Sequence, residues 1–278
     1  MSPKITFLPH LTAALAAFLL TSCAAPRSIA WDGTVAKRGD FQVQANSATS
    51  VPTAALKPVL DGLDKMLDKD PSLPDLRLAT RAGVAAAVDR PGALLDLNAH
   101  IGLGWNLDVG YHYIEGSHGV GLRWQFLDDD WRAGIEALYV HGSWDPVGAE
   151  RLGFKFQRED LVVPASFSIP FGNAAKYGSF AMGPAVAFTW LRYGFSPTFE
   201  VKDDSDASYV AQTIPMTRAF FWSQGGFVSL RAGYSKVFFL VGLSMWHTNY
   251  GTFKVPEQDP VHLEGITMVP SLGLELRL

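Results

Sequence analysis

The chain has 278 residues, which is enough for one large all-β domain or for two smaller domains. Its 23 basic and 27 acidic residues nearly balance, and no run of Lys or Arg could follow a phosphate backbone, so we expect no nucleic acid partner. The 26 glycines and eight tryptophans are typical of closely packed strands with aromatic anchors at a membrane surface, rather than of a helical protein.

The first 22 residues (1–22) have the features of a secretory signal peptide. Lys4 precedes the apolar stretch LTAALAAFLL (residues 11–20), which is too short to cross a bilayer as a helix but suits the core of a signal peptide. The sequence LTSC that ends at Cys23 resembles the lipobox of bacterial lipoproteins. That resemblance implies that Cys23 is lipidated and, because Ala24 follows it, that the lipoprotein-sorting machinery delivers the protein to the outer membrane. Cys23 is the single cysteine, so no disulfide competes, and the alternative is an ordinary signal peptide with a chance cysteine.

Residues 23–75 are expected to form a periplasmic N-terminal segment. Residues 24–52 are small and polar, with a candidate extra strand at 40–45. Between residues 53 and 69, apolar side chains recur at helical spacing on one face, and Asp and Lys side chains occupy the other. Thr53 is in place to cap the first turn, so the pattern predicts one short amphipathic helix at about 53–69.

From residue 76 onward the hydrophobic period changes to two, which is the period of a strand. Ten alternating segments follow, each near the ~9 to 11 residues that a tilted strand needs to cross the hydrocarbon layer. They are residues 76–88, 94–104, 106–114, 119–127, 131–143, 161–171, 179–193, 225–235, 237–250 and 264–278. No stretch after Cys23 is long and apolar enough for a transmembrane helix. The pattern predicts an all-β fold, an antiparallel transmembrane β-barrel over residues 76–278, with about ten strands and with eight or twelve as alternatives.

The connections between the predicted strands alternate in length. Those after the second, fourth, sixth and eighth segments are short, whereas those after the fifth, seventh and ninth are long and polar. Short periplasmic turns and long extracellular loops are typical of outer-membrane barrels. With ten strands, both chain termini are expected at the short-turn, periplasmic end, and the loops at 145–160, 196–218 and 251–262 are expected outside the cell.

Alternation alone also fits a soluble β-sandwich, so the polar face decides between the two. No lysine falls in the middle of a predicted strand, whereas arginines do, and Arg suits buried ion pairs. We therefore expect a narrow barrel whose lumen carries paired charges. The predicted lumen network consists of Arg77, Arg81, Asp96, His100, Asp108, His112, Arg123, Arg132, Glu136, Arg231, Glu275 and Arg277.

Aromatic side chains gather near both ends of the predicted strands, as Trp and Tyr do at the two membrane interfaces. Over residues 76–278 the chain thus resembles small bacterial outer-membrane β-barrel proteins. Its last strand, SLGLELRL, is similar to the assembly signal of that class, except that Leu278 stands where an aromatic residue is usual. The resemblance implies the barrel-assembly machinery as a partner and outer-membrane lipid and lipopolysaccharide as surroundings.

Three groups of residues are candidates for a metal site, for buried ion pairs or for catalysis. His100 and His112 lie with carboxylates on one face of neighbouring strands, which could bind a metal or form a hydrogen-bond network; the spacing favours the network, so we expect no metal and no other cofactor. Arg123 with Glu136, and Glu275 with Arg77, are predicted lumen ion pairs. The sequence WHTNYG around His247 is faintly similar to the His-x-Ser-Asn stretch of outer-membrane lipid A deacylases, but Asn249 stands where the Ser would be.

No catalytic residue follows from the sequence. We predict a lipid-anchored outer-membrane barrel with a structural or surface-interaction role, which is not a catalyst. The alternatives are an outer-membrane enzyme acting on lipid or peptide and, as a third class, a small pore. Because opposite charges can bridge a lumen this narrow, we expect no steady conduction.

Overall fold

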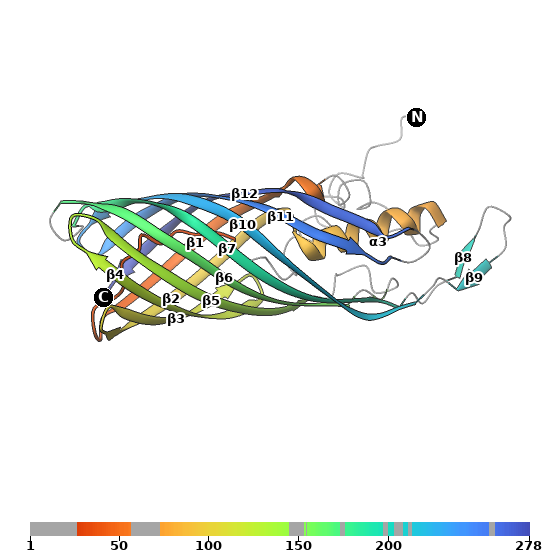
Figure 1. Ribbon diagram of the computed structural model, residues 1–278, viewed down its shortest axis with the longest axis horizontal. Coiled ribbons are helices and arrows are strands. Elements are labelled where there is room, and N and C mark those ends of the chain that lie inside the picture. Colours follow the sequence, from red (N-terminus) through yellow and green to blue (C-terminus); the bar gives the residue numbers. More distant parts are fainter. Residues whose placement is uncertain are drawn as a thin grey trace, which may run out of the picture.

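The computed structural model describes residues 27–56, 73–144, 153, 155–172, 176–196, 200–202, 208–210, 213–255 and 259–278. Ten strands form one closed antiparallel barrel, in the spatial order β1-β12-β11-β10-β7-β6-β5-β4-β3-β2 (Figure 1). This confirms the predicted fold class and the predicted number of strands.

The barrel strands are β1 (Phe41–Pro52), β2 (Gly92–Gly104), β3 (Leu107–Ile114), β4 (Ser117–Asp128), β5 (Arg132–Trp144), β6 (Lys155–Phe171), β7 (Gly178–Phe195), β10 (Ile214–Tyr234), β11 (Val237–Phe253) and β12 (Val261–Arg277). The short strands β8 (Glu200–Lys202) and β9 (Ser208–Val210) pair with each other in the connection between β7 and β10. One end of the barrel, here called the short-turn end, carries tight turns and Leu278. The opposite, long-connection end carries every longer connection, together with one tight turn at Glu115 and Gly116.

The first predicted strand, residues 76–88, is wrong. The structure has a helix there, α3 (Leu73–Val88), on the connection between β1 and β2. The sequence AGVAAAV that ends the helix is rich in alanine, the strongest helix former, and Val84, Ala85 and Val88 place one buried face on it. Because Arg77 and Arg81 lie in α3, neither belongs to the barrel wall, and Arg81 is exposed.

The missing tenth strand is β1, so the barrel begins at Phe41 and not at residue 76. Within the N-terminal segment, the candidate strand at 40–45 was the only sequence signal for β1. β1 closes the barrel between β12 and β2, in a register that sets Gln44 opposite Glu275 on one side and Asn98 on the other. Its inward residues are polar and its outward residues are mostly small, so its alternation is inconspicuous in the sequence. Of the helix predicted at 53–69, residues 53–56 are helical and the remainder lies outside the described residues.

The barrel is apolar outside and largely polar inside. In β11 the outward side chains include Val237, Phe239, Val241, Leu243 and Met245, all exposed. The inward side chains of β10, β11 and β12 include Ser229, Ser244, Ser271, Arg231 and Glu275, all buried. This arrangement is the opposite of a water-soluble barrel, and it is the one that a lipid environment stabilises. None of the helices in the described part of the chain has the length and apolar character needed to cross a bilayer.

Residues 27–40 run through the lumen, and this stretch is called the luminal segment below. Its side chains Ile29, Trp31 and Thr34 are buried inside the barrel. At one end, Gly39 donates a backbone hydrogen bond to Gly102 near the short turns (3.0 Å). At the other, Arg27 contacts Tyr250, close to the long-connection end of β11. The expectation that the chain has both termini at the short-turn end holds for Leu278, but Arg27 lies at the opposite end.

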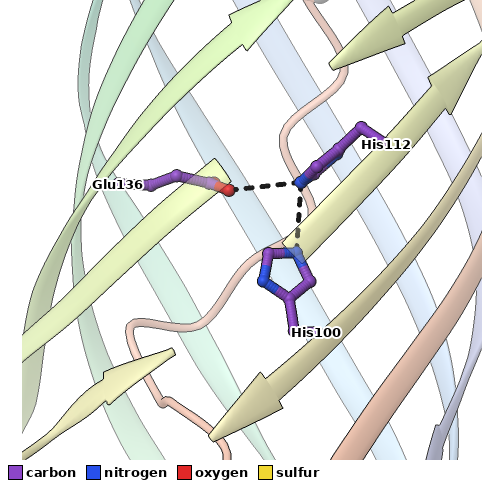
Figure 2. Close-up of side chains that lie close together, drawn as sticks. All are labelled: His100, His112 and Glu136. Carbon is purple, nitrogen blue, oxygen red and sulfur yellow. Dashed lines mark hydrogen bonds and ion pairs between the residues drawn. The ribbon is translucent and has the colours of Figure 1, made fainter. Parts of the chain in front are cut away.

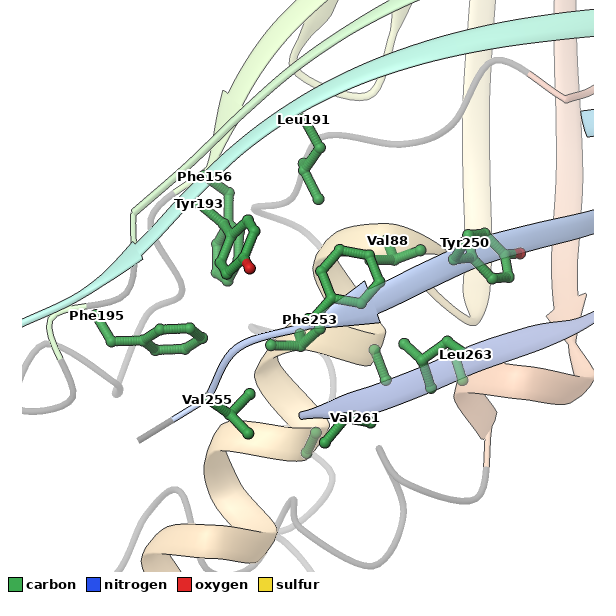
Figure 3. Packing of buried hydrophobic residues seen from close by; sticks show 14 of the residues in the cluster. Val88, Phe156, Leu191, Tyr193, Phe195, Tyr250, Phe253, Val255, Val261 and Leu263 are labelled. Atoms are coloured by element: carbon green, nitrogen blue, oxygen red, sulfur yellow. The ribbon is translucent and has the colours of Figure 1, made fainter. Parts of the chain in front are cut away.

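A cluster of buried apolar side chains fills the lumen at the long-connection end (Figure 3). Buried residues of α3, including Val84 and Val88, belong to the same cluster as Tyr193, Phe253 and Leu263 from the barrel wall. The rings of Tyr193 and Phe253 meet edge to face, with centroids 5.5 Å apart. The helix therefore packs onto the inner wall of the barrel through an apolar face.

Candidate functional site

The polar interior of β2, β3, β4 and β5 brings together six of the predicted lumen residues. Strand register explains the grouping, because side chains on directly paired positions share a face. His112 is paired with Asn98, Asp108 with Arg123, and Arg123 with Glu136. The six residues are Asp96, His100, Asp108, His112, Arg123 and Glu136, and all are buried.

The two histidines link three carboxylates into one chain of contacts. His100 Nδ1 lies 3.0 Å from Asp108 Oδ1, and His100 Nε2 lies 3.1 Å from His112 Nε2. His112 Nε2 also lies 3.4 Å from Glu136 Oε1 (Figure 2), while His112 Nδ1 lies 3.9 Å from Asp96. A hydrogen bond between two ring nitrogens needs a proton on one of them, so the two imidazoles form one hydrogen-bonded unit.

Arg123 lies between these histidine–carboxylate contacts and the luminal segment. Its Nε donates to Glu136 Oε1 at 3.2 Å, and its guanidinium carbon lies 5.3 Å from the centre of the Trp31 ring. Glycine is needed beside the cluster, because a Cβ on Gly110 would lie 2.3 Å from the His100 ring. The luminal segment thus completes the network that the four strands begin.

A second charged group lies around β1, β10 and β12. Arg231 contacts Asp32 of the luminal segment through Nη2 (2.6 Å) and Glu275 through Nη1 (3.3 Å). Arg277 Nε donates to Glu275 Oε1 at 2.6 Å, and Gln44 donates to the other carboxylate oxygen at 2.8 Å. The predicted pair of Glu275 with Arg77 is therefore wrong, because Arg231 and Arg277 hold Glu275 instead.

A third group fixes the luminal segment at the long-connection end. Arg27 Nη1 donates to Asp89 Oδ2 at 2.9 Å and to Thr267 Oγ1 at 3.1 Å. The hydroxyl groups of Tyr250 and Thr267 donate to the same oxygen of Asp89. Since Asp89 follows α3 directly, this group ties the helix, the luminal segment and two strands to one carboxylate.

Arg132 remains from the predicted residues, and several buried charged residues were not predicted. Arg132 lies 3.0 Å from Asp128 beside the short turns. Sequence reasoning missed Arg27, Asp32, Asp89, Arg158 and Asp160, which form buried ion pairs. For Arg158 and Asp160 the alternation of a strand that begins at Lys155 was the available signal, whereas nothing in the sequence shows that residues 27–40 enter the lumen.

His100, His112 and Glu136 also have the residue types of a metal site, with ligand atoms within 4.8 Å of one another. The donor set fits a cation poorly, however. Arg123 donates to the same Glu136 oxygen that faces His112, so a metal there would lie beside a fixed positive charge. The cavity beside His112 and Glu136 has a volume of about 20 Å³, which is room for about one water molecule. The contacts fit a hydrogen-bond network better than a metal centre.

The histidine of WHTNYG lies on the outer rim. His247 Nε2 lies 3.3 Å from Glu264 Oε1, and both side chains are exposed on neighbouring strands. Glu264 also lies 3.9 Å from His262, whose Nδ1 is 3.3 Å from the hydroxyl of Thr252. Asn249 accepts a hydrogen bond from the backbone of Gly251 at 2.9 Å. An amide that hydrogen-bonds across an irregularity in β11 occupies the position where a deacylase-like strand would carry its serine.

A contact at the tight turn of the long-connection end involves two groups with shifted pKa values. Arg90, which precedes β2, lies 3.4 Å from Glu115 in the turn between β3 and β4. Burial raises the pKa of Glu115, and the nearby Arg90 guanidinium lowers it by a smaller amount. Burial likewise lowers the pKa of Arg90 against the opposing effect of Glu115.

Comparison with known proteins adds little to this geometry. No known family profile matches the chain, and no curated protein matches it. Among solved structures, the chain is similar to Neisserial surface protein A, with 11% identity, a TM-score of 0.32, and coverage of 86% of this chain and 99% of that one. It is also similar to Ail, the attachment invasion locus protein of Yersinia pestis (9% identity, TM-score 0.34, 87% and 99% covered). The outer membrane protease OmpT from Escherichia coli gives 10% identity, a TM-score of 0.37, and 86% and 94% coverage. At such low scores these likenesses carry no argument about function.

Proposed function

We propose that the chain is a bacterial outer-membrane β-barrel protein with a structural or surface-interaction role, and that it is neither a catalyst nor an open pore. One observation carries this proposal: an apolar outer wall surrounds a lumen that the protein fills with its own luminal segment. The C-terminal strand is the part offered to the barrel-assembly machinery, and outer-membrane lipid and lipopolysaccharide are the surroundings of the wall.

Aromatic side chains at both ends of the wall support a membrane location. Trp105, Trp131 and Tyr177 are exposed near the short turns, while Trp190 and Trp222 are exposed toward the long connections. Trp and Tyr collect at the two faces of a bilayer because their rings are amphipathic. The outward side chains between these bands are predominantly aliphatic or aromatic, as the hydrocarbon layer requires.

The luminal segment is the argument against a pore. Trp31 and Asp32 occupy the bore, and Arg123 and Arg231 hold them from opposite parts of the wall. Purified protein in a planar lipid bilayer is expected to show no steady conductance. A variant that lacks both residues 27–36 and α3 removes the luminal segment and the apolar cluster of α3 but keeps all ten strands, so it is expected to conduct. Stable, uniform steps of porin size from the intact protein would refute the proposal and favour the pore.

The connection lengths support one orientation of the barrel. Because short turns face the periplasm in outer-membrane barrels, the proposal has α3, the long connections and Arg27 on the cell surface. Cys23 precedes Arg27 by four residues, and an extended chain spans at most ~3.6 Å per residue, so Cys23 reaches no more than about 14 Å from Arg27. A lipid on Cys23 would therefore anchor in the outer leaflet. This differs from the expectation from sequence alone, in which the anchor lies on the periplasmic side.

Two measurements test anchor and orientation together. Labelled palmitate should enter the protein but not a Cys23→Ala variant. Protease added to intact cells should cut within residues 145–160, 196–218 or 251–262. Lack of label would refute the lipid anchor alone, whereas cleavage only after permeabilisation of the outer membrane would show that the barrel has the opposite orientation.

A second candidate function, a lipid-modifying enzyme, rests on the rim contacts of His247, Thr252, His262 and Glu264. A hydroxyl next to a histidine that lies near a carboxylate is the arrangement of a nucleophile, a base and an orienting group. Alanine variants of His247, Thr252, His100 and His112 should leave the mass profile of lipid A unchanged. Loss of a lipid A modification in a rim variant alone would establish the enzyme instead.

A further inference from the structure

Two arginines face each other directly on the outer wall. In the register of β7 and β10, Arg218 is the partner of Arg192. Both side chains are exposed, and both follow the outward parity of their strands. Like charges directly opposite each other on antiparallel strands destabilise the pair, so this juxtaposition needs a compensating negative charge.

The pair lies at the upper edge of an aromatic band. One pair of positions nearer the middle of the strands, Phe220 is opposite Trp190, and next to them Trp222 is opposite Phe188. The Trp190 and Phe220 rings are 5.6 Å apart, and both are exposed. Since such rings lie at the level of lipid headgroups, the two guanidinium groups lie at that level or just beyond it.

No protein carboxylate compensates the pair within the part of the chain that the structure describes. Neither arginine has an ion-pair partner among those residues. The nearest acid by register is Glu159, which is opposite Trp190 and therefore diagonal to Arg192. Its carboxylate lies 3.8 Å from His141 on the other side. Glu264 on the same rim likewise has a histidine partner, His247.

Beyond Glu159, the neighbouring strand β6 extends the polar row with an amide and a cation. Gln157 of β6 is opposite Arg192, and Lys155 is opposite Gly194, one outward position further from the membrane. Both side chains are exposed. The row therefore offers three cations and an amide above an aromatic surface, on strands whose backbone is fixed by the barrel.

We propose that Arg192 and Arg218 together bind the phosphate group of an outer-leaflet glycolipid of the lipid A class. A guanidinium donates two parallel hydrogen bonds to a phosphate, and two opposed guanidinium groups can share one anion. The acyl chains of the same lipid would lie against Trp190 and Phe220. This site rests on the proposed outer-membrane location, and it is separate from the lumen and from the histidine rim.

Purified protein in detergent tests the site without reference to its place in the cell. Binding of bisphosphorylated lipid A is measured by native mass spectrometry for the wild type, for R192Q/R218Q, and for R192K/R218K. The matched control is K176Q/K236Q, which removes two exposed cations at the short-turn end. A boiled versus unboiled gel shows that each variant retains the folded barrel. Dephosphorylated lipid A and inorganic phosphate serve as ligand controls.

The expected result is saturable binding of lipid A to the wild type and to K176Q/K236Q. R192Q/R218Q should bind at least about tenfold more weakly, and R192K/R218K should fall between, because lysine keeps the charge but loses the paired hydrogen bonds. Dephosphorylated lipid A should bind the wild type as weakly as intact lipid A binds R192Q/R218Q. Equal binding by wild type and R192Q/R218Q, or full binding of dephosphorylated lipid A, would overturn the site. Displacement by millimolar inorganic phosphate would show a free-anion site and overturn the lipid assignment.

Discussion

The two halves of the barrel interior are filled by different chemistry. Toward the short turns, Asp32, Arg231, Glu275 and Arg277 form a cluster of buried charges in which each carboxylate meets a guanidinium. Toward the long connections, α3 and the wall meet in an apolar cluster around Phe253. Buried ion pairs contribute little net stability but penalise any arrangement that separates them, whereas apolar burial stabilises without fixing one arrangement. The polar half therefore specifies where the luminal segment lies, and the apolar half supplies stability.

The largest loss of stability is expected when one partner of a buried ion pair in the polar half is removed. Arg231→Leu removes the guanidinium that lies 2.6 Å from buried Asp32 and leaves that of Arg277 at 3.9 Å, and we expect the free energy of unfolding to fall by about 3–5 kcal/mol. Urea unfolding in lipid vesicles measures it. Arg81→Leu, an exposed arginine in α3, serves as the control and should change stability by no more than about 0.5 kcal/mol. A cost for Arg231→Leu as small as that of the control would show that the charged cluster does not hold the segment.

The apolar half should respond to lost volume. Phe253 is fully buried against Tyr193, so Phe253→Ala should lower the free energy of unfolding by about 3 kcal/mol through lost burial and a cavity. Phe253→Leu should cost about 1 kcal/mol, since it retains most of the volume. If both variants unfolded like the wild type, α3 would not be packed on the wall in the membrane-bound protein.

A charged side chain on the outer wall should lower the stability of the barrel, although the lumen contains buried charges. Val241 points outward near the middle of β11, and Val241→Arg should cost about 2–3 kcal/mol, because it brings a cation into hydrocarbon. Val241→Leu is the matched control and should be close to neutral. The same unfolding measurement in detergent micelles and in vesicles tests the assignment, and an unaffected Val241→Arg protein in vesicles would contradict a lipid-facing wall.

The smallest effect is expected at the tight turn of the long-connection end. Because burial raises the pKa of Glu115 in the folded state, ionisation of this carboxyl costs the folded state stability. Its contribution is fully present below the unfolded pKa of about 4.3 and is lost as the pH rises through the folded pKa. In Glu115→Gln this pH dependence should vanish, a change of at most about 0.5 kcal/mol between pH 4 and pH 7. A steeper loss of stability on acidification in the wild type than in the variant would reverse the sign.

Much of the wall was predictable, because its outward residues alternate with period two over whole strands, as in β11 and β12. The exceptions have physical causes. In α3 a period-two reading of LRLATRAGVAAAV hid an alanine-rich helix, since short apolar runs fit both periods. β1 has outward residues as small as Ala45 and Ser47, which give no alternation to read. The pairing of Arg123 with Glu136 follows from register alone, but Asp32 and Arg27 reach the site through a segment without periodicity.

The path of the luminal segment also has a consequence for the order of folding. Arg27 bonds to Thr267 across 240 residues of sequence, and Thr34 bonds to Arg277 across 243. Contacts between such distant parts of a chain form slowly, because much loop entropy must be lost before they form. During synthesis the segment is made first, yet its partners on β12 are made last. The segment therefore cannot complete its native contacts until the final strand arrives, and barrel closure and complete filling of the lumen become one late event.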